Sequence, residues 1–193
     1  MKTNYRQMLG NDIVDLNLAK IQSNWRRKNY LDKIFTEEEH RLISSAKDPD
    51  VLVWILWSMK ESAYKICNRI TNKRLFNPAA FQCSIVELNN ETAKGLVNYN
   101  TLKVLTTTEI KTEFIHTIAT DDIRFSKNIR LWRNQYPLNY PQLFNKQNTD
   151  YQLYKNENNL PEVKNLCNKT PHHVSVSHHG NYLCIVFDSD PIR

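Results

Sequence analysis

The sequence has little glycine, few cysteines and no long apolar run, and each shortage excludes a class of protein. Only three of its 193 residues are glycine, and neither GxxxxGK[ST] nor GxGxxG occurs. This argues against a phosphate-binding loop built on backbone amides, so a phosphate site is expected to use side chains or a metal. The four cysteines form no CxxC pair, and neither a signal-like segment nor an apolar run of 18 residues is present. We expect a cytoplasmic protein without disulfides or membrane spans.

What the chain does have is a basic surplus, with a formal charge of +6. The basic residues cluster in three places: Arg26-Arg27-Lys28, Lys60 with Lys65, and Lys73-Arg74. Such a surplus favours polyanionic partners. Nucleic acid, a phosphorylated cofactor and an acidic protein all qualify, and a solvated basic surface needs no partner at all. Charge alone does not choose among these.

The hydrophobic pattern predicts an α+β fold, with helices packed beside antiparallel sheets. Between Val51 and Arg69, apolar residues recur every three or four positions, which predicts a long helix with one buried face. A further helix begins at Thr36, where Glu39 completes a capping box. A strand is expected at 10–16, followed by a helical stretch to about residue 30. Runs rich in β-formers predict the remaining strands, at 81–88, 96–99, 102–108, 114–120, 174–178 and 182–187.

Two segments between these strands are harder to classify. Residues 126–136 begin with Ser126 as a candidate N-cap and are predicted as a helix. Residues 136–159 are rich in Asn, Gln, Tyr and Pro and are predicted as a flexible loop or linker.

Four short motifs indicate a function. The string Trp57-Ser58-Met59-Lys60-Glu61-Ser62-Ala63-Tyr64-Lys65 resembles the WxxKExxxK signature of the 4′-phosphopantetheinyl transferases. Residues 10–15, GNDIVD, are similar to the GxDIV/E strand of that family, and residues 174–179, VSVSHH, are similar to its SxSH strand. Residues 35–39, FTEEE, match its FTxxE helix start. Together these motifs reach from residue 10 to about 188.

The resemblance implies a role for each motif residue. Asp12 and Glu61 would hold Mg²⁺. Glu61 is also a candidate to accept the proton of the acceptor serine, directly or through a metal-bound water, although the identity of the base stays open. Lys65 would contact the pyrophosphate, and Ser177 with His178 would bind the phosphates at the nucleotide end of coenzyme A. Other interpretations remain open: Glu61 and Lys65 also fit an ordinary helix pair, and a lone histidine on a strand is often structural.

The sequence also departs from the family pattern. Where the longer, surfactin-activating type often has a second acidic residue, this chain has Val14, and Asp15 is only a weak substitute on the other strand face. The family's basic Gly-Lys-Pro or Gly-Arg-Pro appears as residues 159–161, NLP. Arg74 or Lys155 would have to supply that cation, although each also fits a solvated surface charge.

The basic cluster Arg26, Arg27 and Lys28 matches the place where small family members present basic residues to the carrier protein. A solvent-facing cluster explains it equally well.

Short holo-carrier-protein synthases have the same motif order, in sites closed between the subunits of a trimer. Here two β-rich blocks follow the KE helix, so the chain resembles a permuted, shortened two-half enzyme. We expect a metal-bearing half at 1–124, a smaller half at 125–193 with the SxSH strand, and a monomer, with a trimer as the alternative.

The function expected from this resemblance is Mg²⁺-dependent transfer of the phosphopantetheine arm of coenzyme A to a serine of an apo acyl or peptidyl carrier protein. No nucleic acid or membrane partner is expected. One alternative is a basic nucleic-acid-binding module, which would lack any recognised fingerprint. Another is a family member that has lost activity and only binds a carrier protein, although its motif residues are intact.

Overall fold

Two five-stranded sheets, one after the other along the chain, form the framework of the computed structural model. The structure describes residues 8–122, 128–135 and 139–189. The strand orders are β1-β5-β4-β3-β2 and β6-β10-β9-β8-β7, and every strand pair in the described residues is antiparallel. The expected α+β class, with antiparallel sheets beside helices, is confirmed.

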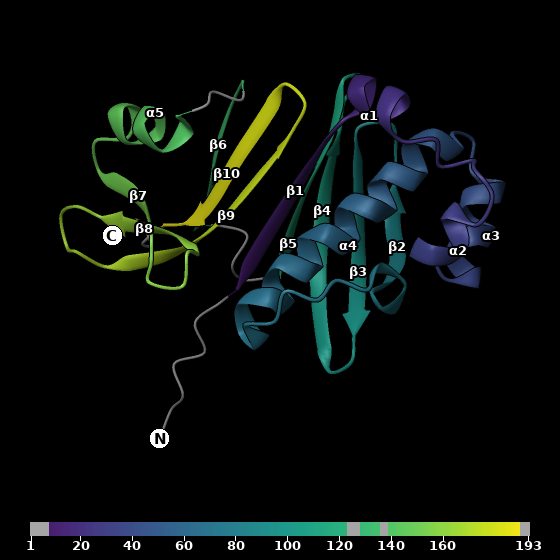
Figure 1. Ribbon diagram of the computed structural model, residues 1–193, viewed down its shortest axis with the longest axis horizontal. Coiled ribbons are helices and arrows are strands. Elements are labelled where there is room, and N and C mark those ends of the chain that lie inside the picture. Colours follow the sequence, from purple (N-terminus) through teal and green to yellow (C-terminus); the bar gives the residue numbers. More distant parts are fainter. Residues whose placement is uncertain (1–7, 123–127, 136–138, 190–193) are drawn as a thin grey trace.

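The first sheet carries most of the helices. Its strands are β1 (Leu9–Asp15), β2 (Gln82–Leu88), β3 (Thr92–Tyr99), β4 (Leu102–Ile110) and β5 (Phe114–Thr120). The helices are α1 (Leu16–Gln22), α2 (Tyr30–Ile34), α3 (Glu37–Ser45) and α4 (Pro49–Thr71), with the short 3₁₀ helix η1 (Pro78–Ala80). Figure 1 shows α4 lying across one face of this sheet, with α2 and α3 beside it.

Helix α4 confirms the long helix predicted from periodicity. The Asp48 carboxylate caps it by accepting a hydrogen bond from the Val51 amide at 3.1 Å, and Asn72 ends it in the left-handed conformation, at φ 57°. The predicted apolar face is buried in the main core: Leu52, Ile55, Leu56, Met59, Ala63 and Ile66. The predicted capping box of α3 is also present, with Thr36 and Glu39 each accepting a backbone hydrogen bond from the other.

The second sheet corrects two predictions. Its elements are β6 (Ile129–Gln135), α5 (Tyr140–Gln147), β7 (Tyr151–Lys155), β8 (Pro161–Asn165), β9 (Pro171–His179) and β10 (Tyr182–Asp188). The predicted helix at 126–136 is wrong, because 129–135 pair along the whole of β10, and Ser126 lies outside the described residues. The predicted loop at 136–159 is also wrong, because α5 and β7 occupy most of it and Phe144 is fully buried in the second core.

The helical stretch expected to reach residue 30 ends earlier. Helix α1 stops at Gln22, and residues 23–29 form turns in which the Arg27 amide donates to the Asn24 carbonyl at 3.2 Å. Asn29 then adopts the left-handed conformation, at φ 63°, before α2 begins. The basic cluster 26–28 therefore lies in the turns between two helices and not on a helix.

The two sheets meet along β1 and β9 (Figure 1). In the described residues β1 is the edge strand of its sheet, and its free edge faces β9. The Asn11 amide donates to Ser175 Oγ at 2.8 Å, and the Asp15 amide donates to His179 Nδ1 at 2.9 Å, so the strands run in the same direction. We call this junction the seam. The predicted boundary between residues 124 and 125 falls outside the described residues.

Among the described residues, no helix combines the length and the apolar character needed to cross a membrane.

Candidate active site

Three of the predicted site residues line one cavity beside the seam. This cavity has a volume of about 350 Å³, and Asp12 of β1, Glu61 of α4 and His178 of β9 all face it. The rest of its lining comprises Ile13, Val14, Ala19, Ser23, Tyr30, Trp54, Trp57 and His179. Segments from both sheets, far apart in the sequence, thus contribute to one site.

Lys65 lies beside Asp12 but does not line this cavity. Its ammonium donates to the Asn11 carbonyl at 2.6 Å and lies 3.4 Å from Asp12 Oδ1. The side chain remains partly exposed and lines a neighbouring cavity of about 170 Å³. The helix pair of Glu61 and Lys65 considered from the sequence therefore gives an incomplete description, because Lys65 bonds to β1.

A close approach of β1 to α4 places Asp12 opposite Glu61. A β-carbon added to Gly10 would lie 2.0 Å from the Ser62 carbonyl oxygen, so only glycine lets the two backbones come this close. The Ser58 hydroxyl donates to the Asp12 carbonyl at 3.1 Å, and the Ser62 hydroxyl donates to the Thr117 carbonyl at 3.2 Å. Two buried serines thus fix the positions of β1 and β5 along α4.

The two carboxylates perturb each other. Burial, and secondarily the charge of Asp12, raises the pKa of Glu61 to about 7, although Lys65 opposes the shift. Burial also raises the pKa of Asp12, against the opposing effect of Lys65. The cavity therefore holds two acidic groups that take up a proton, or a cation, more readily than exposed carboxyls do.

The donor set fits a hard divalent cation. Asp12 Oδ2 is buried and has no hydrogen-bond partner in the described residues. Within that same part of the chain, no group of three or more His, Cys, Asp or Glu side chains is placed to hold a metal. Two carboxylates are what Mg²⁺ uses when substrate phosphates and water complete its coordination. Asp12 and Glu61 therefore suit a hard divalent cation such as Mg²⁺.

Asp15 is not a third carboxylate of this site. Its Oδ1 accepts hydrogen bonds from the Asn17 and Leu18 amides at 3.0 and 3.1 Å, which caps α1. Its Oδ2 accepts from the Asn181 amide at 3.1 Å, which holds the turn between β9 and β10. Both oxygens thus have structural partners, and the weak candidate from the sequence is corrected.

Ser177 and His178 point to opposite faces of β9, as neighbouring residues of a strand must. His178 is exposed at the cavity, and burial together with Lys65 lowers its pKa below the ordinary value. Ser177 is 3% exposed, and its hydroxyl donates to Asn11 Oδ1 inside the seam. His178 thus faces the cavity, whereas the Ser177 hydroxyl faces the seam and is not placed for the predicted phosphate contact.

The basic residues differ in their exposure to solvent and in whether they are paired with an acidic residue. Lys60 is completely buried beside Glu39 and adds nothing to a basic surface. Arg26 is exposed, yet its guanidinium makes two hydrogen bonds to the Asp50 carboxylate, at 2.7 and 2.8 Å. Arg27 lies over the Tyr30 ring at 4.8 Å, and Lys28 is exposed. Because Tyr30 lines the cavity, the cluster stands at its border.

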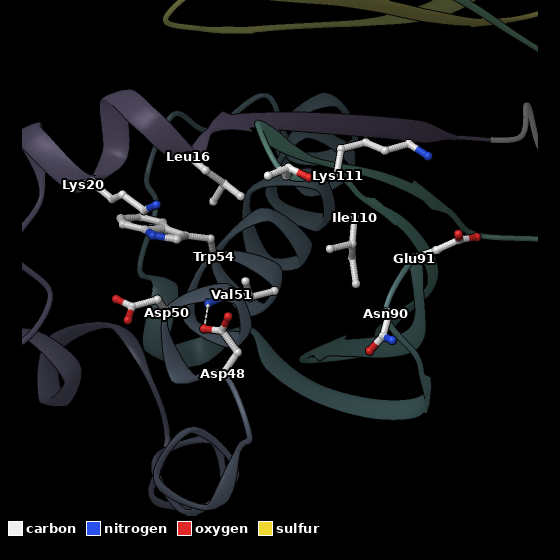
Figure 2. Close-up of a pocket in the computed structure, with 11 residues that line it drawn as sticks. Leu16, Lys20, Asp48, Asp50, Val51, Trp54, Asn90, Glu91, Ile110 and Lys111 are labelled. Carbon is white, nitrogen blue, oxygen red and sulfur yellow. Dashed lines mark hydrogen bonds between the residues drawn. The ribbon is translucent and has the colours of Figure 1, made fainter.

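A larger cavity of about 590 Å³ lies at the start of α4 (Figure 2). Its acidic residues include Asp48, which caps the helix, and Asp50, which is paired with Arg26. Figure 2 shows Trp54 between these acids and Lys20, and Trp54 also lines the smaller cavity. Since Asp48 and Asp50 already have structural partners, the smaller cavity with Asp12 and Glu61 is the better candidate for chemistry.

The sequence did not reveal the importance of Asn11, His116 and His179. Asn11 and His116 are buried in the seam, and His179 lines the cavity while accepting from the Asp15 amide. A signal existed for the first two, because an amide within a strand and a histidine within the apolar run 114–120 both break the expected pattern.

A comparison with protein families agrees with the motifs. The family model of the 4′-phosphopantetheinyl transferase superfamily matches residues 8–135, well over half of the chain. The match includes Asp12, Glu61 and Lys65 and ends before β9. A comparison with curated proteins gave no match. With both carboxylates, the KE helix and the first sheet inside the matched region, the chain belongs to the 4′-phosphopantetheinyl transferase superfamily.

Proposed function

We propose that this protein is a holo-acyl-carrier-protein synthase that moves the 4′-phosphopantetheine arm of coenzyme A to a serine of an apo acyl or peptidyl carrier protein, with Mg²⁺ as cofactor. The family supports phosphopantetheinyl transfer in general. The observation that carries the finer proposal is the juxtaposition of Asp12, Glu61 and His178 in one cavity. Such a set can hold a cation, a phosphate and a reacting hydroxyl together.

Asp12 and Glu61 are the residues that would hold Mg²⁺, and the bound ion would neutralise the charge of the pyrophosphate. Glu61 is also placed in the cavity where it would accept the serine proton, directly or through a metal-bound water. A carboxylate has two oxygens, so one can face the ion while the other faces the serine hydroxyl. Lys65, held by the Asn11 carbonyl, would stabilise the phosphate that departs with 3′,5′-ADP.

His178 would bind the phosphates at the nucleotide end of coenzyme A. It is exposed at the cavity opposite Glu61, on the side contributed by the second sheet. Because its pKa is lowered, the imidazole is mostly neutral at pH 7 and donates a single hydrogen bond to a phosphate oxygen.

The border of the cavity suits an acidic protein partner. Three basic residues are exposed next to Tyr30, which also lines the cavity: Arg27, Lys28 and Arg26. Arg26 is less available to a partner because it is paired with Asp50. An acidic carrier bound to these residues would bring its serine close to Glu61. Their charges would speed association more than they would strengthen the final complex.

One chain supplies groups from both of its sheets to the cavity, which supports a monomer over the trimer considered from the sequence. All four cysteines are free thiols, which supports a reducing cytoplasm as the place of action.

The formal charge of +6 still favours a nucleic-acid-binding module as the second candidate. The burial of Lys60 and the pairing of Arg26 weaken that candidate.

Mass spectrometry tests the proposal directly. The protein is incubated with coenzyme A, Mg²⁺ and an apo carrier protein, and the carrier is then weighed. We expect a gain equal to one phosphopantetheine arm, abolished by a chelator, by Glu61→Gln and by replacing the acceptor serine with alanine. No gain across several carriers would contradict the proposal. Tight, salt-sensitive binding of DNA or RNA without affinity for coenzyme A would support the second candidate.

A further inference from the structure

A chain of buried and half-buried polar side chains crosses the seam. Arg133 of β6 bonds to Glu109 of β4 and lies 3.2 Å from His116 Nδ1, through Nη2 in both contacts. On its other side, His116 Nε2 lies 3.2 Å from Asn11 Oδ1, which also accepts from the Ser177 hydroxyl. These residues come from both sheets, and we call them the seam network.

The chemistry of Arg133 fixes the direction of this network. A guanidinium nitrogen can only donate, so His116 Nδ1 must accept and the imidazole proton must sit on Nε2. That proton is then donated to Asn11 Oδ1. Burial, together with the charge of Arg133, lowers the pKa of His116 to about 3, so the ring is neutral at physiological pH. His116 therefore acts as a fixed donor toward Asn11.

Asn11 uses all its polar atoms. Its backbone and side-chain nitrogens donate to Oγ and the carbonyl oxygen of Ser175, at 2.8 and 2.6 Å. Its side-chain oxygen accepts from His116 and Ser177, and its backbone carbonyl accepts from Lys65 at 2.6 Å. Leucine cannot make the side-chain bonds to Ser175, His116 and Ser177, and aspartate lacks the side-chain donor to the Ser175 carbonyl. Asn11 thus connects β1 to β9 and to α4 at once.

We propose that Asn11 and His116 are positioning residues for the transfer reaction, fixing Lys65 relative to Asp12. This inference rests on the proposed function. Its basis is geometric: Asn11 directly precedes Asp12, holds the Lys65 ammonium, and bonds to Ser175 and Ser177 on the strand that carries His178. A displacement of about 1 Å at such a junction lowers turnover by roughly 100-fold when reacting groups must be aligned.

Variants of His116 separate a positioning role from a merely structural one. His116→Leu removes the donor to Asn11, whereas His116→Gln keeps an N–H near the position of Nε2. We expect His116→Leu to lower kcat roughly tenfold or more, with KM for coenzyme A changed by less than about threefold. His116→Gln should retain kcat within about threefold. The matched control is Thr108→Val, which breaks a buried 2.8 Å hydrogen bond to Thr117 in the same sheet without touching Asn11.

A second variant covers the case in which His116→Leu does not fold. Ser177→Ala removes one hydroxyl from the other end of the seam network and leaves a small side chain. As a member of the network, Ser177 should affect kcat. As a phosphate ligand, which the motif alone suggested, it should instead raise KM for coenzyme A. Rates are divided by the folded fraction measured by thermal unfolding.

Equal activity of His116→Leu and His116→Gln would overturn the inference. An equal loss of kcat in Thr108→Val would also overturn it, because any weakening of the sheet would then suffice. If the wild-type protein transfers no phosphopantetheine, the proposed function fails and the inference fails with it. An active wild type whose kcat is unaffected by His116→Leu and Ser177→Ala would reject this inference alone.

Discussion

The Lys60 ammonium lies 2.8 Å from Glu39 Oε2, and neither side chain is exposed to solvent. Lys60 also donates to the Pro78 and Phe81 carbonyls, while Glu39 accepts from the Thr36 and Cys83 amides. This pair joins α3, α4 and β2. Because Lys60 precedes Glu61, the pair also fixes the helix that carries the candidate catalytic carboxylate.

Removing one member of this buried pair should lower the free energy of unfolding. Lys60→Met leaves the Glu39 carboxylate buried without a cation, and such a loss costs about 3–5 kcal/mol of unfolding free energy. The double variant Lys60→Met, Glu39→Leu removes both charges and should be less destabilised than the single variant. Urea unfolding measures all three proteins. Lys94→Met, which breaks the exposed 2.8 Å pair with Glu87, is the control and should cost about 0–1 kcal/mol. A double variant that is less stable than Lys60→Met would contradict the expectation.

Local patterns predicted the parts of the fold that are governed locally. The apolar period from Val51 to Arg69, the capping box at Thr36, and the placement of Asp12, Glu61 and His178 around one cavity follow from sequence patterns and motifs. The predicted helix fails at residues 129–135 because pairing with β10, distant in sequence, decides their conformation. Composition likewise hid α5 and β7, because a few buried side chains such as Phe144 outweigh many polar ones.

The rest of the site depends on geometry that no linear pattern contains. Ser177 belongs to the SxSH motif, but the strand's alternation and the position of β1 turn its hydroxyl into the seam. Asp15 was considered as a metal ligand, yet α1 and the turn at Asn181 take both of its oxygens. Arg26 and Lys60 are paired with acidic residues of other elements. The sequence therefore does not show that these two charges are unavailable to a partner.

Removing the available basic residues should weaken carrier recognition selectively. In Arg27→Ala, Lys28→Ala we expect KM for the carrier protein to rise roughly tenfold, equal to about 1.4 kcal/mol, because favourable charges at the docking border are lost. KM for coenzyme A should stay unchanged, and the salt dependence of transfer should weaken. Arg26→Ala should have a smaller effect, because Asp50 already holds that guanidinium. Steady-state kinetics at several salt concentrations test this, with Lys94→Ala as the control. An equal rise with Lys94→Ala would contradict the docking role.

Replacing Gly10 by alanine should displace β1 from α4. The added β-carbon would lie 2.0 Å from the Ser62 backbone oxygen, which cannot rotate away as a side chain could. Overpacking of this kind costs about 1–3 kcal/mol. Because Asp12 lies two residues further on the same strand, transfer activity per folded molecule should fall as well. Chemical denaturation and the mass-spectrometric assay measure the two effects, and full activity with unchanged stability would contradict the close approach.

The raised pKa of Glu61 predicts how stability depends on pH without metal. An ordinary glutamate titrates near 4.5, whereas Glu61 titrates near 7 in the folded state, so folding takes up a proton between these values. The resulting stability is fully present below pH 4.5 and is lost as the pH rises through 7. Glu61→Gln removes this dependence. At pH 8 the variant should unfold with a free energy higher than wild type by on the order of 1–3 kcal/mol, and the difference should vanish near pH 4.

Mg²⁺ should reverse that effect, because a cation replaces the proton as the partner of Asp12 and Glu61. Binding then requires the ionised carboxylate, so the affinity for Mg²⁺ should rise between pH 6 and pH 8 with release of a proton. Isothermal titration calorimetry in buffers of different ionisation enthalpy measures both quantities. Glu61→Gln should lose the binding and the proton release, whereas Glu91→Gln, an exposed carboxylate beside the larger cavity, should keep both. An affinity independent of pH, or unaltered by Glu61→Gln, would remove Glu61 from the metal site and leave it as a base alone.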